Sequence, residues 1–595
     1  MNLGKIFVFI PLLLPVWEKM PFDSLNTEVP RAPFYADSAA IRLQADYYSK
    51  NKDARINSRI AVSLAISNNP VAVEVLEGLL QNEKNTLAQA DILSALYNMR
   101  GIGNCKKISL LKALLKSPNA SARAFAAALY MKASNDVSPV CEMLAAENSE
   151  FVIKFIWSEI SSSIDLCMNT RDSDMDKFQA SENHCQRAGA VRVAVIKSQE
   201  PDGEARLNKI LSDKDIMVRY ALASALALKK KGGDSLLKAL SDDREVSIRA
   251  MVASACPSEG RRRAHVKLSS DSDEEVRRLA CVSLGAYKDM DSINALIPRI
   301  GDGAKQVRDA AERSLVKINP DKDVQKRIGD ECLNSRESRA AAVAVLGELN
   351  DARFSPEILK LLQSADDKEV DFVRRCVTSL CNLDYRESCN TLMAKASHSD
   401  AGVREAVASA LGKFKMKDSY ETILKLSDDK VVPVSAQAIE SMGWTADPFF
   451  SDKLLAVIKK TVGEYPAENR SYACWSIAKI NSPSKQTLSQ LNDLCMKTVL
   501  TVPMSPNTFD MDFVRISALF ALIDMGRTNP AAKKMAEDII SAFMSEGKSA
   551  DQAIAGDILK EYARQAKAYM ENEKISPVEV KPEAPNFLLE EMKKK

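Results

Sequence analysis

The chain lacks most of the patterns that catalytic and nucleotide sites require. Its twelve cysteines include no C-x-x-C pair, so paired thiol ligands or a thioredoxin-type motif are not indicated. Gly301-Asp302-Gly303 and Gly101-Ile102-Gly103 are predicted to be helix-ending loops, because no strand precedes them as a phosphate cradle would require. No serine or cysteine nucleophile stands in a recognisable motif. We therefore expect no enzyme activity, no catalytic residue and no cofactor site.

The chain also lacks an excess of charge and has few aromatic residues. Its net charge is +2 with acids and bases interleaved, which argues against a nucleic-acid surface along the chain. Residues 229–267 are locally basic, but Asp242, Asp243 and Glu245 dilute them. We interpret this stretch as solvated helix ends and loops, with a partner-facing patch as the alternative. Aromatic residues make up 6% of the chain, and alanine and leucine dominate its apolar positions instead.

A repeated apolar stripe is the main positive signal, and it is clearest between Asp271 and Asn319. Spacings of i, i+3, i+4, i+7 and i+8 place such positions on one face of an α-helix. The stripes comprise Val276, Leu279, Ala280, Ser283 and Leu284; Val307, Ala310, Ala311, Ser314 and Leu315; Val218, Ala221, Leu222, Ala225 and Leu226; Val403, Ala406, Val407, Ala410 and Leu411; and, early in the chain, Ala122, Phe125, Ala126, Leu129 and Tyr130. The pattern predicts one amphipathic helix in each repeat.

An arginine or its equivalent marks each copy of the repeat. The marker positions are Arg59, Gln89, Arg123, Lys154, Arg192, Arg219, Arg249, Arg277, Arg308, Arg339, Arg374, Arg404, Ser435, Arg470 and Arg515. Their mean spacing is about 33 residues, a length typical of helix-pair repeats. The predicted fold is all-α, an α-solenoid of about fifteen stacked antiparallel helix pairs in which each repeat buries its face against its neighbours.

The remaining cysteine and tryptophan positions are predicted to be core. Cys256, Cys376 and Cys381 lie on the stripes, where a free cysteine behaves as a small apolar residue. A disulfide framework is not expected in so long a helical chain. Trp157 lies on a stripe, and Trp444 and Trp475 lie in helical stretches, so core packing is the default interpretation.

The two ends of the chain differ from its middle. Residues 1–20 are apolar and resemble the start of a signal peptide, although no small-x-small cleavage site follows; a helix that caps the first repeat is the alternative. The run is too short to span a bilayer, so no transmembrane span is expected. The signal-like start favours export, whereas the free cysteines favour a reducing compartment. Export and a cytoplasmic location therefore both stay open. Residues 21–35 are predicted to be a linker and 574–595 a flexible tail.

The repeats themselves divide into three predicted regions. Residues 36–190 hold divergent repeats with a polar insertion at 165–187, residues 191–445 hold the clear repeats, and residues 446–573 hold divergent repeats and a cap. Weaker signals at both ends are typical of capping repeats, whose outer face must be polar.

One cluster has a metal-like composition: His184-Cys185 near Asp172, Asp174 and Asp176. The aspartates begin like a calcium loop, but the turn glycine and the bidentate glutamate are replaced, by Lys177 and Asn183 respectively. We interpret the run as a solvated acidic loop and expect no metal site. His265 and His398 lie in distant repeats, so a shared histidine site is not expected either.

The unit Asp-x-x-x-Val-Arg-x-x-Ala-x-x-x-Leu-Gly resembles the HEAT repeat, specifically the PBS-lyase-type HEAT-like repeat. The matching residues are Asp215, Val218, Arg219 and Leu226; Asp273, Val276, Arg277, Ala280, Leu284 and Gly285; and Asp400, Val403, Arg404, Ala406, Leu411 and Gly412. The resemblance implies that the Val-Arg helices are inner helices lining a concave groove, near which Arg278, Glu405, Asp309 and Glu312 would lie. The motif aspartate is expected to cap its helix, and the arginine to bond neighbouring carboxylates and carbonyls.

The resemblance also implies a function. HEAT-repeat proteins serve mainly as protein-binding scaffolds, so we expect a non-catalytic scaffold or adaptor whose partner is another protein. An exported or envelope-associated structural component is the first alternative, and a bilin-lyase-like enzyme or chaperone is a lesser one. The sequence identifies neither the partner nor the oligomeric state.

Overall fold

The computed structural model describes residues 38–51, 53–67, 69–99, 107–198, 207–229, 232–460, 466–480, 484–496, 508–544 and 556–571. All regular secondary structure in these ranges is helical, so the predicted all-α class is confirmed. The predicted apolar start (1–20), linker (21–35) and tail (574–595) lie outside the described residues, as does the glycine loop at 101–103. In the described part, no helix is both long enough and apolar enough to cross a membrane.

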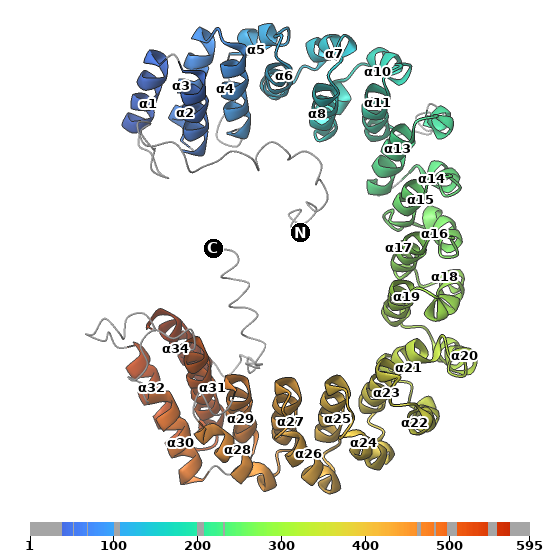
Figure 1. The fold of residues 1–595 in the computed structure, drawn as a ribbon, viewed down its shortest axis with the longest axis vertical. Coiled ribbons are helices and arrows are strands. Elements are labelled where there is room, and N and C mark those ends of the chain that lie inside the picture. Colours follow the sequence, from blue (N-terminus) through green and yellow to red (C-terminus); the bar gives the residue numbers. More distant parts are fainter. Residues whose placement is uncertain are drawn as a thin grey trace. The chain divides into compact units, whose positions relative to one another are not determined.

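The chain divides into two compact units, Met1–Leu268 and Ser269–Lys595. In each unit, alternate helices stack in succession to form one row, here called the ladder row, and the intervening helices form a second row on its other side (Figure 1). Each pair therefore buries its apolar face against the pairs before and after it, which is the construction of a helical solenoid.

In the first unit the ladder row comprises α2 (Ala54–Ile66), α4 (Thr86–Asn98), α6 (Ala120–Ser134), α8 (Glu150–Ser161), α11 (His184–Lys197), α13 (Ile216–Leu228) and α15 (Val246–Ala253). Its second row comprises α1 (Ser38–Lys50), α3 (Pro70–Asn82), α5 (Ile108–Leu114), α7 (Ser138–Ala145), α9 (Ile164–Asn169), α10 (Asp172–Gln179), η1 (Asn208–Ser212), α14 (Asp234–Leu240), η2 (Glu259–Arg261) and α16 (Arg262–Leu268).

In the second unit the ladder row comprises α17 (Glu274–Leu284), α19 (Lys305–Ile318), α21 (Arg339–Glu348), α23 (Val370–Asn382), α25 (Ala401–Phe414), α27 (Val432–Thr445), α29 (Ala467–Lys479) and α31 (Thr508–Gly526). Its second row comprises α18 (Met290–Leu296), η3 (Ile297–Gly301), α20 (Lys322–Cys332), η4 (Ala352–Phe354), α22 (Ser355–Ser364), η5 (Arg386–Ser388), α24 (Cys389–Lys395), η6 (Lys417–Ser419), α26 (Tyr420–Leu426), η7 (Pro448–Phe450), α28 (Ser451–Lys459), α30 (Lys485–Met496) and α32 (Pro530–Met544). The last described helix, α34 (Gly556–Glu571), packs on α31 and α32.

The predicted stripes form the core of the ladder row. In α19 all five predicted positions are buried, and in α13 only Ala225 is half-buried. Leu279, Ala406 and Phe125 are also half-buried, because they lie at the edge of the stripe rather than at its centre. Burial of an alanine or leucine stripe stabilises each helix pair by about 25 cal/mol for each Å² of apolar surface removed from water.

An arginine ladder ties successive repeats together in the way the motif predicts. Arg277 in α17 donates from Nε and Nη2 to both carboxylate oxygens of Asp302, at 2.8 and 2.9 Å, and from Nη1 to the carbonyls of Asp271 and Ser272. Asp302 also accepts the backbone N–H of Ala304 at 3.0 Å. Equivalent pairs are Arg123–Glu147, Arg187–Asp213, Arg219–Asp243, Arg339–Glu369 and Arg404–Asp429. The ladder thus satisfies helix-end carbonyls and links each repeat to the next.

In most ladder helices the ladder position lies four residues after the N-cap, and this corrects four of the predicted markers. In α21, Arg339 directly follows the N-cap Ser338, and its N–H bonds to the carbonyl of Ser335. The arginine equivalents are Asn57 rather than Arg59, Ile153 rather than Lys154, Arg187 rather than Arg192, and Val373 rather than Arg374. Asn57 and Gln89 still donate to the carbonyl six residues before them, as the arginines do. Ile153 and Val373 are fully buried, so those two repeats are held by apolar contact instead.

With Arg187 as the ladder residue, the polar insertion predicted at 165–187 no longer lengthens its repeat. The Val191-Arg192 dipeptide imitates the motif, but the ladder residue is Arg187, which follows Ile153 by an ordinary repeat length of 34 residues. The stretch is not an acidic loop either, because Ile164–Asn169 and Asp172–Gln179 form helices α9 and α10. Asp172 and Asp174 pair with Lys197 and Arg171.

Acidification should weaken the ladder. Burial alone would raise the pKa of Asp302, but the hydrogen bonds from Arg277 and Ala304 outweigh it and leave that pKa below its usual value. The unfolded state therefore binds more protons in this range, so the stabilisation is complete above the unfolded pKa of about 3.9 and is lost as pH falls through the lower folded value. Urea denaturation at decreasing pH should show this loss. Asp302→Asn should reduce the pH dependence, and an unchanged pH profile would contradict this account.

Glycine–serine contacts set the helix spacing in the second unit. In four helix pairs a serine hydroxyl donates to a carbonyl of the preceding ladder helix at 2.8–2.9 Å: Ser314 to Cys281, Ser379 to Val343, Ser441 to Ala408 and Ser476 to Ile439. A Cβ on Gly412 would lie 2.4 Å from the Cβ of Ser441, so only glycine permits this approach.

The cysteine and tryptophan predictions are confirmed in part. Every cysteine in the described residues is free, and Cys376 and Cys381 are buried as predicted. Cys256 is exposed, because α15 ends at Ala253 and the stripe ends with it. Trp157 is buried, whereas Trp444 and Trp475 are half-buried and approached by lysine ammonium groups.

Candidate functional site

An aromatic cluster lies on three consecutive ladder helices of the first unit. The ring centroids of Tyr97 in α4, Phe125 in α6 and Phe155 in α8 are 5.4 Å apart in all three pairs, and Phe151 stacks on Phe155 at 5.9 Å. Tyr97, Phe125 and Phe155 are half-buried, and Phe151 is 39% exposed. In a chain with few aromatic residues, four have gathered at one partly exposed place.

A polar contact orients the cluster. The hydroxyl of Tyr97 donates to a carboxylate oxygen of Glu159 at 2.6 Å, so the bond joins α4 to α8 across the intervening α6. Phe125 lies on α6, where its ring contacts those of Tyr97 and Phe155. The ring of Tyr97 therefore packs in the cluster while its hydroxyl is hydrogen-bonded. This arrangement suits a partly solvent-exposed apolar surface. We refer below to Tyr97, Phe125, Phe151 and Phe155 as the aromatic cluster.

A charged cluster lies on two ladder helices of the second unit, α19 and α23. Arg375 in α23 binds Glu312 in α19 at 2.5 Å and Asp371 at 2.9 Å, with Asp309 at 3.7 Å. The Arg375–Glu312 pair joins two helices that both pack on α21. Burial raises the pKa of Glu312 despite the opposing effect of Arg375. Glu312 and Arg375 already satisfy one another, so this cluster offers a partner less unpaired charge than its composition suggests.

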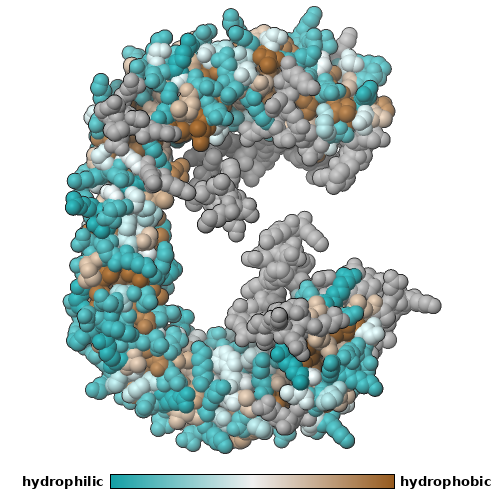
Figure 2. Space-filling model, turned by 180° about the vertical axis from the view of Figure 1, so that it is seen from behind, coloured by the Kyte–Doolittle hydropathy of each residue, from teal (hydrophilic) through white to brown (hydrophobic). Residues whose placement is uncertain are grey.

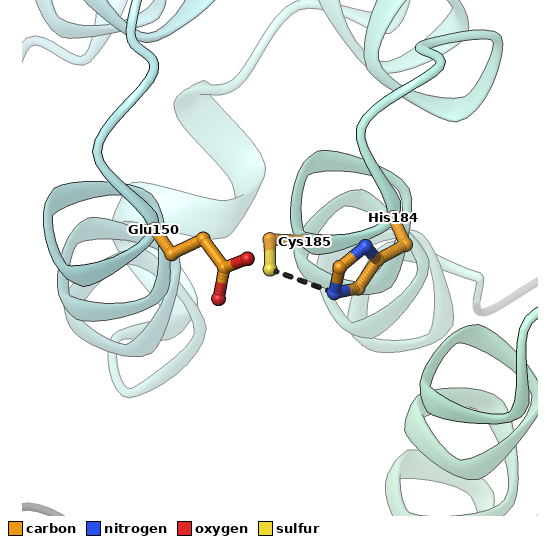
Figure 3. A group of neighbouring side chains, drawn as sticks. All are labelled: Glu150, His184 and Cys185. Carbon is orange, nitrogen blue, oxygen red and sulfur yellow. Dashed lines mark hydrogen bonds between the residues drawn. The ribbon is translucent and has the colours of Figure 1, made fainter.

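A third group joins α8 to α11. Nε2 of His184 lies 3.3 Å from Sγ of Cys185, and a carboxylate oxygen of Glu150 lies within 4.8 Å of both ligand atoms (Figure 3). Nδ1 of His184 is 3.9 Å from Oδ2 of Asp215, the N-cap of α13. Cys185 is buried, and burial raises the pKa of its thiol. The predicted neighbours Asp172, Asp174 and Asp176 lie on α10 instead, so the group assembles through Glu150 and Asp215.

The other two histidines are in separate surroundings, as the sequence predicts. His265 is fully buried in α16, and burial lowers its pKa to about 4, so it is neutral at physiological pH. Nε2 of His398 is 3.0 Å from the carbonyl of Asp367, and its Nδ1 accepts the N–H of Asp400. Both side chains are therefore interpreted as part of the packing between helices.

Family comparison identifies the repeats. Residues 263–326 and 355–443 match the family of HEAT repeats. The chain contains HEAT repeats. The matched ranges include the arginine–aspartate pairs Arg277–Asp302 and Arg404–Asp429 and the glycine–serine contact of α25 and α27. The solenoid extends beyond the matched ranges on both sides. No curated protein matches the sequence.

Solved structures similar to this HEAT-repeat chain have low sequence identity. Kap121p is 11% identical over 92% of this chain and 74% of its own, with a TM-score of 0.49. Importin beta is 11% identical over 90% of each chain, with a TM-score of 0.44. The complex of CpcE and CpcF of phycocyanin lyase from Nostoc sp. PCC7120 is 17% identical over 39% of this chain and 92% of its own, with a TM-score of 0.27.

The residues expected near the groove of the HEAT repeats are mostly paired. Arg278 binds Glu275 with both its Nε and Nη2, and Asp309 and Glu312 belong to the charged cluster. Glu405 is half-buried on α25. The sequence missed the aromatic cluster because Phe125 fits the core stripe, and its partners stand in other repeats about 30 residues away.

In the described part of the basic stretch at 229–267, Arg244, Arg263 and Lys267 are exposed, as expected of solvated helix ends, but Arg261 is not. Arg261 is buried and donates to Asp234 and to the carbonyls of Cys256, Leu226 and Gly232. Arg261 is thus neither at a solvated helix end nor on a partner-facing patch, the two interpretations from the sequence. On the face seen in Figure 2, hydrophobic surface occurs as separate patches among hydrophilic residues.

Proposed function

We propose that this protein is a non-catalytic scaffold that binds another protein through the ladder row of its HEAT repeats, with the aromatic cluster as the main contact. The cluster carries the proposal because it is the place in the described first unit where several rings meet at a partly exposed surface. Aromatic side chains are enriched at protein interfaces and supply a large share of binding energy there.

The partner should present apolar side chains to the aromatic cluster. Phe151 offers an exposed ring face, and the neighbouring rings are held in place by one another and by the Tyr97–Glu159 bond. A rigid, pre-formed contact surface loses little conformational entropy on binding, which favours affinity. Glu159 is half-buried and accepts the hydroxyl of Tyr97.

The scaffold role without catalysis rests on the kind of fold. HEAT solenoids are usually non-catalytic, and their repeats provide extended binding surfaces. The arginines and acids that recur in the sequence are taken up by the ladder, so they serve the fold rather than a reaction.

The test is photo-crosslinking followed by titration. A benzoylphenylalanine placed at Phe151 should capture a partner in native cells, and one placed at Phe449 in the second unit should not. The captured protein is then purified and titrated against wild-type chain and Phe151→Ala. We expect the dissociation constant to rise about thirtyfold or more, the size of a binding hot spot.

Phe449→Ala is the matched control, because Phe449 is 48% exposed and also packs within an aromatic group, with Tyr420 and Phe450. It should leave the dissociation constant within about twofold. Circular dichroism of both variants checks that the helices are intact. Equal binding by Phe151→Ala and wild-type chain, with loss of binding in Phe449→Ala, would move the proposed surface to the second unit.

A further inference from the structure

Glu150, His184 and Cys185 bring three different metal-ligand types together. Each residue offers one ligand atom, and the three atoms lie within 4.8 Å of one another on two neighbouring ladder helices (Figure 3). The Asp215 carboxylate approaches the group from a third ladder helix. We propose that Glu150, His184 and Cys185 bind a zinc-class transition metal ion, with Asp215 orienting the histidine.

The position of Cys185 suits it as a thiolate ligand. It lies in the first turn of α11, where the side chain of Asn183 accepts its backbone N–H at 2.8 Å. The positive end of a helix dipole favours a thiolate at this place. Its sulfur is 3.3 Å from Nε2 of His184. Zinc–sulfur and zinc–nitrogen bonds at a tetrahedral angle would place these atoms about 3.6 Å apart, so only a small movement is needed.

The surroundings of His184 also resemble those of a metal ligand. Ligating histidines usually present the second ring nitrogen to a carboxylate, which fixes the ring and raises its basicity. Here Nε2 points to Cys185 and Glu150 while Nδ1 lies 3.9 Å from Oδ2 of Asp215. Oδ1 of Asp215 accepts the N–H of Met217 at 2.8 Å, so capping α13 leaves Oδ2 on the side of the histidine.

Glu150 completes the set after a change of side-chain direction. Its carboxylate accepts a hydrogen bond from Lys154 at 2.8 Å, and both side chains are at least half exposed. An exposed i, i+4 pair contributes little to stability, so metal coordination can replace it. The Lys154 side chain then extends into solvent, and the Glu150 oxygen moves toward the Cys185 sulfur and the His184 imidazole.

The ligand types select the metal. One thiolate, one imidazole and one carboxylate suit Zn²⁺ and related transition ions, whereas Ca²⁺ and Mg²⁺ prefer sites made only of oxygen atoms. Three protein ligands leave a fourth position for water. On binding, the S–H bond of Cys185 breaks, the S–metal bond forms, and the proton is released to solvent without any change of oxidation state. The bound ion would link α8 to α11 beside Phe151 of the aromatic cluster.

Cobalt titration tests the proposal on the full-length chain. The reduced protein, freed of metal with a chelator, is titrated with Co²⁺, whose bond to a thiolate gives an intense near-ultraviolet charge-transfer band. We expect one equivalent of Co²⁺ to saturate the band and Zn²⁺ to displace it. Cys185→Ser should abolish the band while leaving the helical circular dichroism unchanged, because serine has nearly the size of the buried cysteine.

Two further variants separate this site from chance binding to other thiols. Asp215→Asn keeps a good helix cap but removes the charge beside His184, and should weaken Co²⁺ binding about 10–100-fold. Cys256→Ser removes an exposed cysteine elsewhere and should change nothing. A band of equal strength in Cys185→Ser, or no band in the wild-type chain, would overturn the proposal.

Discussion

Replacement of Arg277 by alanine is expected to lower the free energy of unfolding by about 3–5 kcal/mol, the usual effect of removing one partner of a buried ion pair. The side chains of Arg277 and Asp302 are only 16% and 4% exposed. Without the arginine, the Asp302 carboxylate loses both guanidinium bonds and keeps the N–H of Ala304 and the longer contact with Arg299. The carbonyls of Asp271 and Ser272 lose the bonds from Arg277 as well. Because repeats unfold in neighbouring groups, hydrogen exchange should accelerate in α17 and α19 first.

The adjacent arginine provides a matched control. Arg278 forms equally short bonds to Glu275, at 2.6 and 2.7 Å, but the glutamate side chain is 50% exposed. Arg278→Ala should therefore cost less than about 1 kcal/mol. Urea denaturation of both variants measures the difference. If the two substitutions have equal effects, the ladder has no special role and its arginines behave as surface residues.

Gly189→Ala is expected to destabilise the first unit by about 2–3 kcal/mol, although the same substitution usually favours a helix. A Cβ on Gly189 would lie 2.0 Å from the Trp157 ring. The ring has little freedom to move: it is buried, its Nε1 donates to Gln186 at 2.9 Å, and it packs edge-on against Phe178 at 5.1 Å. Thermal and urea denaturation measure the loss.

The control for this prediction is a glycine-to-alanine substitution at another position, Gly78, where we expect stabilisation instead of destabilisation. Gly78 lies on exposed helix surface in α3, and a Cβ there would meet nothing within 4 Å. Gly78→Ala should stabilise the protein by about 0.5–1 kcal/mol. Trp157→Leu should partly rescue Gly189→Ala in the double variant, because a smaller side chain leaves room for the added methyl group. Strictly additive losses would show that the two residues do not compete for space.

Contacts between repeats explain where the sequence was misread. The Val191-Arg192 dipeptide copies the motif locally, yet Arg187 occupies the ladder, because only that position faces Asp213 of the next repeat. Phe125 likewise satisfies the stripe spacing, but rings from α4 and α8 draw it to a partly exposed cluster. In both cases the deciding contact comes from another repeat, which local periodicity does not describe.

The sequence by itself determined the helical class, the repeat, the capping aspartates and the pairing of motif arginines with carboxylates. These follow from spacings within one helix or one repeat, where 3.6 residues per turn decides which side chains share a face. Tertiary structure alone decided that Tyr97 meets Glu159, that Arg375 meets Glu312, and that His184 lies beside Asp215. Those side chains stand on different repeats, and the stacking of helices about 30 to 60 residues apart in the chain is what brings their atoms together.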